Sequence, residues 1–344
     1  MTIEQAWRST RPLSVLGTAH ALPGAPVGSL DLIDHMERRF GFRRGSRARA
    51  AAQRLGVRSR HFVRRFAEAD EPATPTNAAL AATSVEGACA AAGVRPQDLA
   101  YLIAHTTTPD SLLPAGVAAV ADRIGFDGPQ VELRQACTGF ANALMVATGL
   151  FAAGCDRPIA IVGSETGSLH LDPTTLDSDE SQIVNLMQMG DGAGAVVLGP
   201  GGRTAAIEAS WFACTGRQRS PGIALAPGAR HFTHDAVAVL RSGPGLFAAG
   251  AEIAASLGYD VAAVDWVVPH QASGRIAAPL AAHLGCAVDR IAVTADTLGN
   301  TGSAAIWMAL DRLRRNGIAV GQTALALGAE ASKFMVGGFA YRHG

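Results

Sequence analysis

VELRQACTGFANALMVATGL, residues 131–150, is the stretch that decides the fold. Its first three residues predict a strand, residues 136–139 a tight turn, and the apolar run from Phe140 a buried helix. The junction places Cys137 at a helix N-terminus, where unpaired N–H groups and the helix dipole stabilise negative charge. We therefore expect this thiol to lose its proton more easily than a free cysteine. Most cysteines are small buried hydrophobes, so the rest of the chain has to decide between packing and catalysis.

The composition describes a compact globular protein. The chain has 344 residues, of which 48% are hydrophobic and 17% charged, enough for two core-forming units or one large α/β domain. The N-terminal residues contain no apolar signal core and no run of 18 apolar residues occurs, so we expect neither secretion nor membrane insertion. The five cysteines are scattered and predict neither disulfides nor a metal site, which favours a cytoplasmic protein.

Positive charge is concentrated between Arg38 and Arg65, a segment with eleven arginines and no acidic residue, although the net charge of the chain is zero. Such a run is usually a solvated helix face. It could also dock phosphate or an acidic partner, because the guanidinium fork is planar and permanently charged. Binding of nucleic acid is disfavoured, since the nearby aromatic residues form no recognition motif and the whole chain is not basic.

Strands and helices alternate along the chain. We expect strands at residues 12–22, 99–104, 158–162, 193–198 and 205–210, and helices at residues 31–40, 77–92, 114–124 and 235–257. Residues 71–76 predict a loop, and the polar residues 168–188 an irregular surface excursion. The alternation is typical of a largely parallel sheet covered by helices. Pro200-Gly201-Gly202 marks a boundary, which predicts two units, residues 1–200 and residues 201–344.

The two units resemble each other. In the first, LIAH (102–105) is followed by a helix, a strand, CTG (137–139) and finally GSE (163–165). In the second, VVPH (267–270) is followed by a helix, a strand, NTG (300–302) and finally GAE (328–330). Three motif matches in one order, with a helix and a strand at the same place in each unit and near-equal gaps, indicate an internal duplication. In a pseudo-twofold fold, Cys137 and Asn300 would lie at equivalent helix starts and face each other.

Four motifs together resemble the β-ketoacyl-acyl-carrier-protein synthase III family of the thiolase superfamily. They are QACTGF around Cys137, MGDGAGAVVL at residues 189–198, DWVVPHQAS at residues 265–273 and LGNTGSAAI at residues 298–306. Their order matches the family, and the resemblance extends over nearly the whole chain. It implies the α/β thiolase fold, with two duplicated halves in five layers, α-β-α-β-α, and a homodimer. The first half would carry the nucleophilic Cys and the second the His and Asn.

The resemblance also implies a Cys-His-Asn site. Cys137 would be the acylated nucleophile, and His270 and Asn300 would hold the thioester of the second substrate and assist decarboxylation of a malonyl group. Two donors aimed at one oxygen would stabilise the enolate needed for carbon–carbon bond formation. The acyl carbonyl would use another oxyanion hole, formed by the N–H of Cys137 and one near residues 328–331. Taken separately, His270 would be interpreted as a buried structural histidine and Asn300 as a helix cap.

One departure from the family pattern concerns the donor. QRLGVRSR, residues 53–60, resembles the segment that binds the coenzyme A nucleotide, which makes Arg54, Arg58 and Arg60 candidate binding residues. The family's tryptophan four residues before Arg54 is Ala50 here, so stacking on adenine is lost. This favours a carrier-borne donor over coenzyme A. Arg275 keeps the place of a family arginine and is a candidate contact with acyl carrier protein.

A second departure concerns the acyl pocket. The family's glycine-rich C-terminal turn is replaced by GAEAS at residues 328–332, so Gly328 and Ala329 are expected to narrow or reshape the pocket. Leu113, before Pro114, occupies a place where the family often has an aromatic gate contributed by the partner subunit. These changes indicate a specialised relative in a fatty acid or polyketide pathway, not the initiator of fatty acid synthesis.

MGDGAGA could be mistaken for a dinucleotide-binding loop, because Gly190, Gly192 and Ala195 match G-x-G-x-x-A. That loop must lead into a helix, whereas here the strand AVVL follows. We therefore predict no cofactor and no metal, with acyl-coenzyme A or acyl-carrier thioesters as substrates of a condensing acyltransferase. Two alternatives stay open: transfer of the Cys-bound acyl group to an oxygen or nitrogen acceptor, and a subunit of a heterodimeric synthase.

Overall fold

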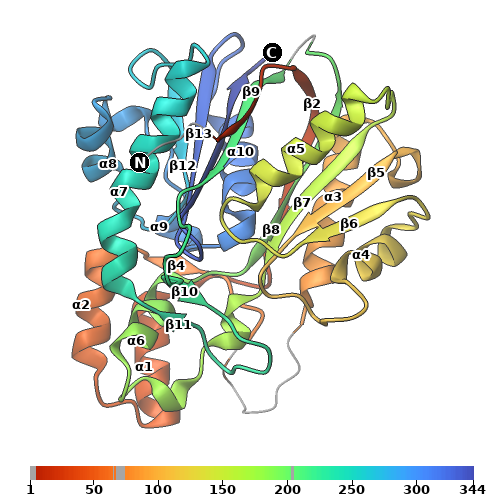
Figure 1. Cartoon of the computed structure of the whole chain (residues 1–344). Helices are drawn as coiled ribbons and strands as arrows, with labels where there is room; N and C mark the ends of the chain where they lie inside the picture. The colour runs from red at the N-terminus through yellow and green to blue at the C-terminus, as the bar shows by residue number, and fades with distance from the viewer. Residues whose placement is uncertain (1–4, 65, 67–73, 203–204) are drawn as a thin grey trace.

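The computed structural model describes residues 5–64, 66, 74–202 and 205–344 (Figure 1). Arg65, at the end of the arginine run, residues 71–73 of the predicted loop and the first four residues of the N-terminus lie outside the described residues. No helix within the described ranges is long and apolar enough to cross a membrane.

The first half of the chain contains most of the helices. Its strands are β1 (Trp7–Ser9), β2 (Leu13–Ala21), β3 (Val27–Gly28), β4 (Ser59–Arg60), β5 (Tyr101–His105), β6 (Gln130–Leu133), β7 (Ile159–Glu165) and β8 (Gly192–Pro200). Its helices are α1 (Ser29–Phe40), α2 (Gly45–Leu55), α3 (Asn77–Ala92), α4 (Gly116–Ile124), α5 (Gly139–Ala152) and α6 (Glu180–Gln188). The predicted strands and helices of this half are all present, with ends that differ by a few residues.

The second half repeats the pattern with fewer additions. Its strands are β9 (Ala206–Cys214), β10 (Ile223–Ala224), β11 (Thr233–His234), β12 (Trp266–Pro269), β13 (Thr323–Glu330) and β14 (Met335–Arg342). Its helices are α7 (Ala236–Ser256), α8 (Ala277–Leu284), α9 (Ala295–Leu298) and α10 (Ala305–Asn316), the last preceded by a 3₁₀ turn at Gly302–Ala304.

Five layers result from the way the helices cover the strands (Figure 1). Helix α3 packs on β2, β7 and β8 from one outside face, and α7 packs on β13 and β14 from the other. Helices α5 and α10 contact strands of both halves and form the middle layer. The contact between the middle layer and the second half-sheet is apolar and aromatic. Trp307 of α10 stacks on Phe339 of the C-terminal strand with ring centroids 5.6 Å apart, and Phe140 of α5 meets both rings edge-on. This is the α-β-α-β-α arrangement expected of the thiolase fold.

The sheet is mixed and not largely parallel as the alternation suggested. Its order is β12-β13-β14-β9-β2-β8-β7-β5-β6, and the two half-sheets meet where Leu13 and Ser14 of β2 pair with β9. Only β5–β6, β5–β7 and β12–β13 are parallel pairs among the named strands. The prediction of a largely parallel sheet was wrong, because the chain reaches β8 and β14 without a crossover helix packed on the sheet and so returns antiparallel.

The duplicated motifs fall at corresponding element ends. His105 ends β5 and His270 follows β12 directly, while Glu165 ends β7 and Glu330 ends β13. The strand β6 has its counterpart in a single parallel bridge between Val267 and Ile291. The two halves therefore present their motifs toward the same middle layer.

The prediction of an irregular surface excursion at residues 168–188 was wrong. Residues 168–188 contain two 3₁₀ turns and helix α6, and several of their side chains are fully buried, among them Ile183 and Leu186. Helix α6 packs on α2, and together with α1 they enclose a separate apolar cluster (lower left in Figure 1). The polar composition of residues 168–188 gave no sign of this cluster, because the apolar residues that α6 packs against come from α1 and α2, which are distant in the sequence.

Candidate functional site

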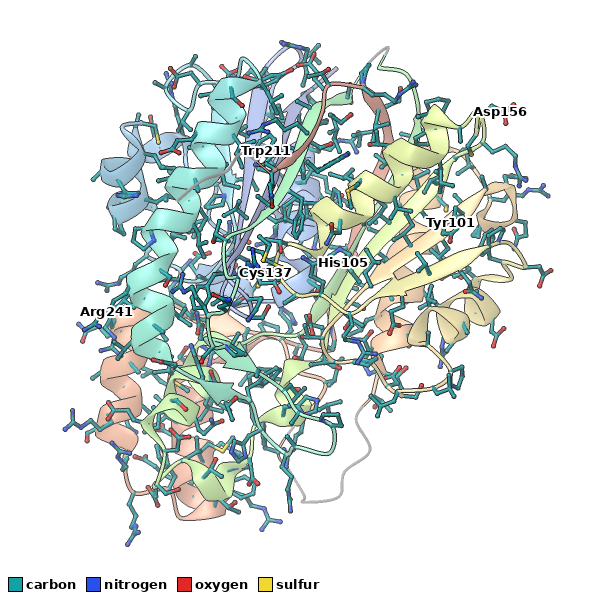
Figure 2. The ribbon with its side chains drawn as sticks, in the orientation of Figure 1. Tyr101, His105, Cys137, Asp156, Trp211 and Arg241 are labelled. Atoms are coloured by element: carbon teal, nitrogen blue, oxygen red, sulfur yellow. The ribbon has the colours of Figure 1, made fainter. Side chains whose placement is uncertain are left out.

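Cys137 lies in the turn between β6 and α5, close to the middle of the molecule (Figure 2). Helix α5 begins at Gly139, two residues later, and the turn is closed by the Gly139 N–H donating to the carbonyl of Ala136 (2.9 Å). Glycine is required there because a β-carbon on Gly139 would lie 2.6 Å from Nδ1 of His105. Cys137 remains a free, partly exposed thiol. The strand-to-helix junction expected from the sequence is thus present.

A carboxylate from the other half occupies this helix start. The backbone N–H of Thr138 donates to Oε2 of Glu330 (2.9 Å), and the Thr138 hydroxyl donates to the same oxygen (2.6 Å). Glu330 is only 2% exposed. The repeat of GSE and GAE marked this glutamate in the sequence, but no spacing rule could place it beside Thr138.

The protonation state of Cys137 differs from the expectation. Burial raises the pKa of the Cys137 thiol well above its usual range, and the carboxylates of Glu330 and Glu165 raise it further. The hydrogen bond from the residue's own backbone N–H lowers the pKa but does not offset them. The prediction of an easily ionised thiol was wrong for the free protein, because burial disfavours the thiolate and the helix end that would stabilise it already faces a carboxylate.

Asn300 precedes the 3₁₀ turn that leads into α10. Its Oδ1 accepts a hydrogen bond from the N–H of Gly302 (3.0 Å), and its backbone pairs with the α6–β8 connection through Gln188 and Gly190. With Oδ1 held in this way, the Nδ2 group is the part of the side chain left to donate. The turn lies against the cysteine loop, since the hydroxyl of Ser303 shares its one proton between the carbonyl of Gln135 (3.2 Å) and the nearer carboxylate of Glu165.

His270 lies at the end of β12, where its backbone N–H donates to the carbonyl of Leu327 in β13 (2.7 Å). The side chain is 5% exposed, and Nδ1 has no hydrogen-bond partner in the part of the chain that is described. Burial lowers the pKa of His270 to about 4, so the imidazole is neutral at pH 7. A neutral imidazole can donate through one nitrogen and accept through the other.

Three loops therefore meet at one place. The His270 loop is hydrogen-bonded to β13, the same strand ends on Glu330, and Glu330 holds Thr138 beside the cysteine. The Asn300 loop is tied to Gln135 on the other side of Cys137. These hydrogen bonds link the loops that carry a thiol, a neutral imidazole and a carboxamide. Within the described ranges, no group of three His, Cys, Asp or Glu side chains is placed to hold a metal ion.

The residues predicted to shape the acyl pocket do not all lie near Cys137. Gly328 lies in β13 directly against Phe140 of α5, where a β-carbon would come within 2.7 Å of the ring, and Ala329 beside it is buried. Gly328 thus lies next to the cysteine helix, whereas Ala329 faces the other side of the strand and packs in the apolar cluster with α7. Leu113 is 89% exposed in the connection between β5 and α4.

The predicted binding arginines are also divided. Arg54, Arg58 and Arg275 are exposed, and Arg275 lies close to the first two because its Cγ would touch a β-carbon placed on Gly56. Arg58 is paired with Asp296 (2.6 Å). Arg60 is different, since it is 0% exposed and its guanidinium donates to the carbonyls of two α6 residues and to a serine hydroxyl. Its assignment as a carrier-binding residue was wrong, because every direction to solvent is closed.

The glycines of MGDGAGA serve close packing. The N–H of Gly190 donates to the carbonyl of Asn300 (3.0 Å), and a β-carbon on Gly190 would collide with the backbone of Leu298. Strand β8 follows at Gly192, so the helix that a dinucleotide loop requires does not occur.

Comparisons with known proteins agree with this architecture. Residues 131–216 match the family described as 3-oxoacyl-(acyl-carrier-protein) synthase III, and residues 254–340 match its C-terminal part. A β-ketoacyl-(acyl-carrier-protein) synthase III of Sphingopyxis alaskensis is 31% identical over 317 residues, which are 90% of this chain and 92% of that protein.

Solved structures are similar over nearly the whole length. A tetronic acid condensing enzyme, AbyA1, superposes with a TM-score of 0.84 at 31% identity, covering 96% of this chain and 99% of its own. The priming β-ketosynthase of a polyketide biosynthetic pathway superposes with a TM-score of 0.78 at 27% identity, covering 97% of each chain.

Proposed function

The chain belongs to the β-ketoacyl-acyl-carrier-protein synthase III family and is a condensing acyltransferase, and we propose that Cys137, His270 and Asn300 carry out its reaction. The observation that carries the proposal is the convergence of their three loops. The cysteine turn is tied to the His270 side of the site by Glu330 and to the Asn300 side by Ser303.

In the first half-reaction, the sulfur of Cys137 attacks the carbonyl carbon of an acyl thioester. A new carbon–sulfur bond forms, the thioester bond to the donor breaks, and the proton of the Cys137 thiol leaves with the donor's thiol. The reaction thus starts from the neutral thiol of Cys137 and ends with the neutral thiol of the donor, which suits a cysteine that is protonated in the free protein. The oxyanion of the intermediate would be held by the Cys137 N–H and by a backbone N–H near Ala329.

In the second half-reaction, a malonyl-type thioester on a carrier loses carbon dioxide. The electron pair of the broken carbon–carbon bond passes into an enolate, whose oxygen accepts hydrogen bonds from His270 and from Nδ2 of Asn300. The enolate carbon attacks the acyl carbonyl on Cys137, and the Cys137 thiolate leaves. Two neutral hydrogen-bond donors suit this step. They stabilise the negative charge that develops on the enolate oxygen, and they do not protonate the enolate carbon that must attack.

A specialised fatty acid or polyketide pathway is the proposed setting. Its support is that two similar solved structures are a tetronic acid condensing enzyme and a polyketide priming ketosynthase. The replacement of the glycine-rich turn by residues 328–332 agrees with a reshaped acyl site. We propose a reducing, cytoplasmic compartment because all five cysteines are free thiols.

The decisive test is release of carbon dioxide. We expect the purified chain alone, given an acyl donor and malonyl-carrier protein, to release one carbon dioxide per β-ketoacyl product. Acyl-enzyme that forms without any carbon dioxide would favour transfer to an oxygen or nitrogen acceptor. A chain that is inert alone but active with a second subunit would indicate a heterodimeric synthase.

The exposed arginines next to the site are the proposed docking place for an acyl carrier protein. Ser273 donates to the carbonyl of Leu55 (2.8 Å), which joins the segment of Arg54 and Arg58 to that of Arg275. Carrier proteins are acidic as a class, and rim charges of this kind act mainly on association rate and salt dependence.

Reversing one of these charges should weaken carrier binding selectively. We expect Arg275→Glu to raise KM for a carrier-borne substrate about fivefold to tenfold at low salt, with kcat retained and the difference shrinking as salt is added. Arg123→Glu on α4, an equally exposed position, is the matched control. Steady-state kinetics at two ionic strengths measure both, and an equal effect of the two variants would contradict the assignment.

A homodimer is the proposed assembly. Among the described strands, β6 ends the sheet order and so offers an unpaired edge, and the connection between β5 and α4 exposes Leu112 (70%) and Leu113 (89%). An open edge beside exposed leucines suits pairing with the same edge of a second copy. In such a pair, Leu113 would be available to the partner's site.

A further inference from the structure

Two buried glutamates cross between the halves of the molecule. Glu165 ends β7 in the first half and reaches the start of α10 in the second, while Glu330 ends β13 in the second half and reaches the start of α5 in the first. They are 4% and 2% exposed. The proposed reaction has no direct use for either carboxylate, although each holds the loop of one proposed catalytic residue.

Glu330 accepts hydrogen bonds on both of its carboxylate oxygens. Its oxygens accept from the N–H and the hydroxyl of Thr138, and from the hydroxyl of Ser332. Three donors on two oxygens satisfy an acceptor-only group. The Thr138 N–H belongs to the helix end that would otherwise stabilise a thiolate on the preceding residue, Cys137.

Glu165 has the corresponding place on the other loop. It accepts from Thr107, Thr108 and Ser303, with the Thr107 N–H at 3.0 Å and the Thr108 hydroxyl at 2.5 Å. Burial raises the pKa of Glu165. Its contacts fasten the Asn300 turn and not the cysteine turn, so it acts on Cys137 only through space.

We propose that Glu330 is a positioning residue of the first half-reaction: by occupying the positive end of α5, it keeps the Cys137 thiol protonated until a donor thioester arrives. The inference rests on the proposed role of Cys137 as the acylated nucleophile. It assigns to the unusual C-terminal turn a function beyond pocket shape. Because the thiolate is the nucleophile, a protonated thiol reacts slowly with electrophiles.

The other titratable groups around the thiol do not provide the same effect. His105 packs against Gly139 from β5 and His270 lies at the end of β12, and burial lowers the pKa of His105 to about 3 and that of His270 to about 4, so both are neutral. Arg134 is exposed and paired with Glu132, and Lys333 is exposed and donates to a backbone carbonyl. Burial is the largest cause of the raised pKa of Cys137, and among the described residues the carboxylates of Glu330 and then Glu165 add to it.

The test is the pH dependence of Cys137 alkylation by iodoacetamide, followed by peptide mapping so that the other four cysteines are counted separately. In the unaltered protein, the midpoint should lie above the pH of about 8.5 at which free cysteine ionises. Glu330→Gln keeps an oxygen for the Thr138 N–H but removes the charge. We expect its midpoint to fall by about one pH unit or more, and alkylation at pH 7.5 to rise about threefold or more.

Two variants separate charge from structure. Ser332→Ala removes one hydrogen bond of Glu330 but keeps the glutamate, so the midpoint of alkylation should not change. Glu165→Gln should shift the midpoint by clearly less than Glu330→Gln. A midpoint below about pH 8 in the unaltered protein would overturn the proposal even if Glu330→Gln failed to fold. Equal shifts for Glu165→Gln and Glu330→Gln would also overturn it. Because alkylation needs no thioester, the outcome does not depend on whether Cys137 accepts an acyl group.

Discussion

Replacing Cys137 by alanine is expected to abolish the acyl-enzyme completely. The covalent intermediate is a thioester to this sulfur, and among the other cysteines Cys89 is buried, while Cys155, Cys214 and Cys286 lie outside the loops that meet at the proposed site. Intact-protein mass spectrometry after incubation with a panel of acyl-coenzyme A and acyl-carrier donors measures the result. The unaltered protein should gain one acyl group, and Cys137→Ala should gain none.

The control for this experiment is Cys214→Ala. Cys214 is the exposed cysteine at the end of β9, and it is the thiol most open to adventitious acylation. Cys214→Ala should retain the single adduct of the unaltered protein. If Cys137→Ala still carried a persistent acyl adduct while Cys214→Ala lost it, Cys137 would not be the nucleophile.

Asn300→Asp is expected to separate the two half-reactions. The aspartate retains an oxygen for the Gly302 N–H, which Asn300 binds at 3.0 Å, so the turn should persist. It replaces the Nδ2 donor by an acceptor, and the enolate oxygen then loses one of its two hydrogen bonds. We expect carbon dioxide release and condensation to fall about 100- to 1000-fold, while acylation of Cys137 continues.

The same substitution at Asn316 provides the matched control. Asn316 is exposed at the far end of α10, the helix that Asn300 precedes, so Asn316→Asp adds the same charge without touching the site. It should leave both half-reactions unchanged. Condensation within about threefold of normal in Asn300→Asp would remove Asn300 from the proposed mechanism, since loss of an oxyanion donor is expected to cost far more.

Much of the fold could be predicted because its signals are local. The strand at β6, the turn at Cys137 and the helix α5 follow from a short change of hydrophobic pattern, and the repeat of three motifs predicted the two halves. The mixed sheet and the buried helix α6 could not be predicted in this way. Strand direction depends on whether a connection crosses over or returns, and the burial of α6 depends on α1 and α2, which are far away in the sequence.

The sequence by itself determined which residues are candidates for the chemistry: one cysteine at a strand-to-helix junction, and a histidine and an asparagine at the equivalent places of a second half. Only the tertiary structure decided the electrostatic environment of these residues. Arg60, one of eleven arginines in a run, is enclosed by α6 carbonyls, whereas Arg275 is exposed. The end of α5, which favours a thiolate when considered locally, is occupied by Glu330 from 192 positions along the chain. Charge acts through space, so its effect on a thiol depends on which distant residues the fold brings near, and sequence spacing does not record that.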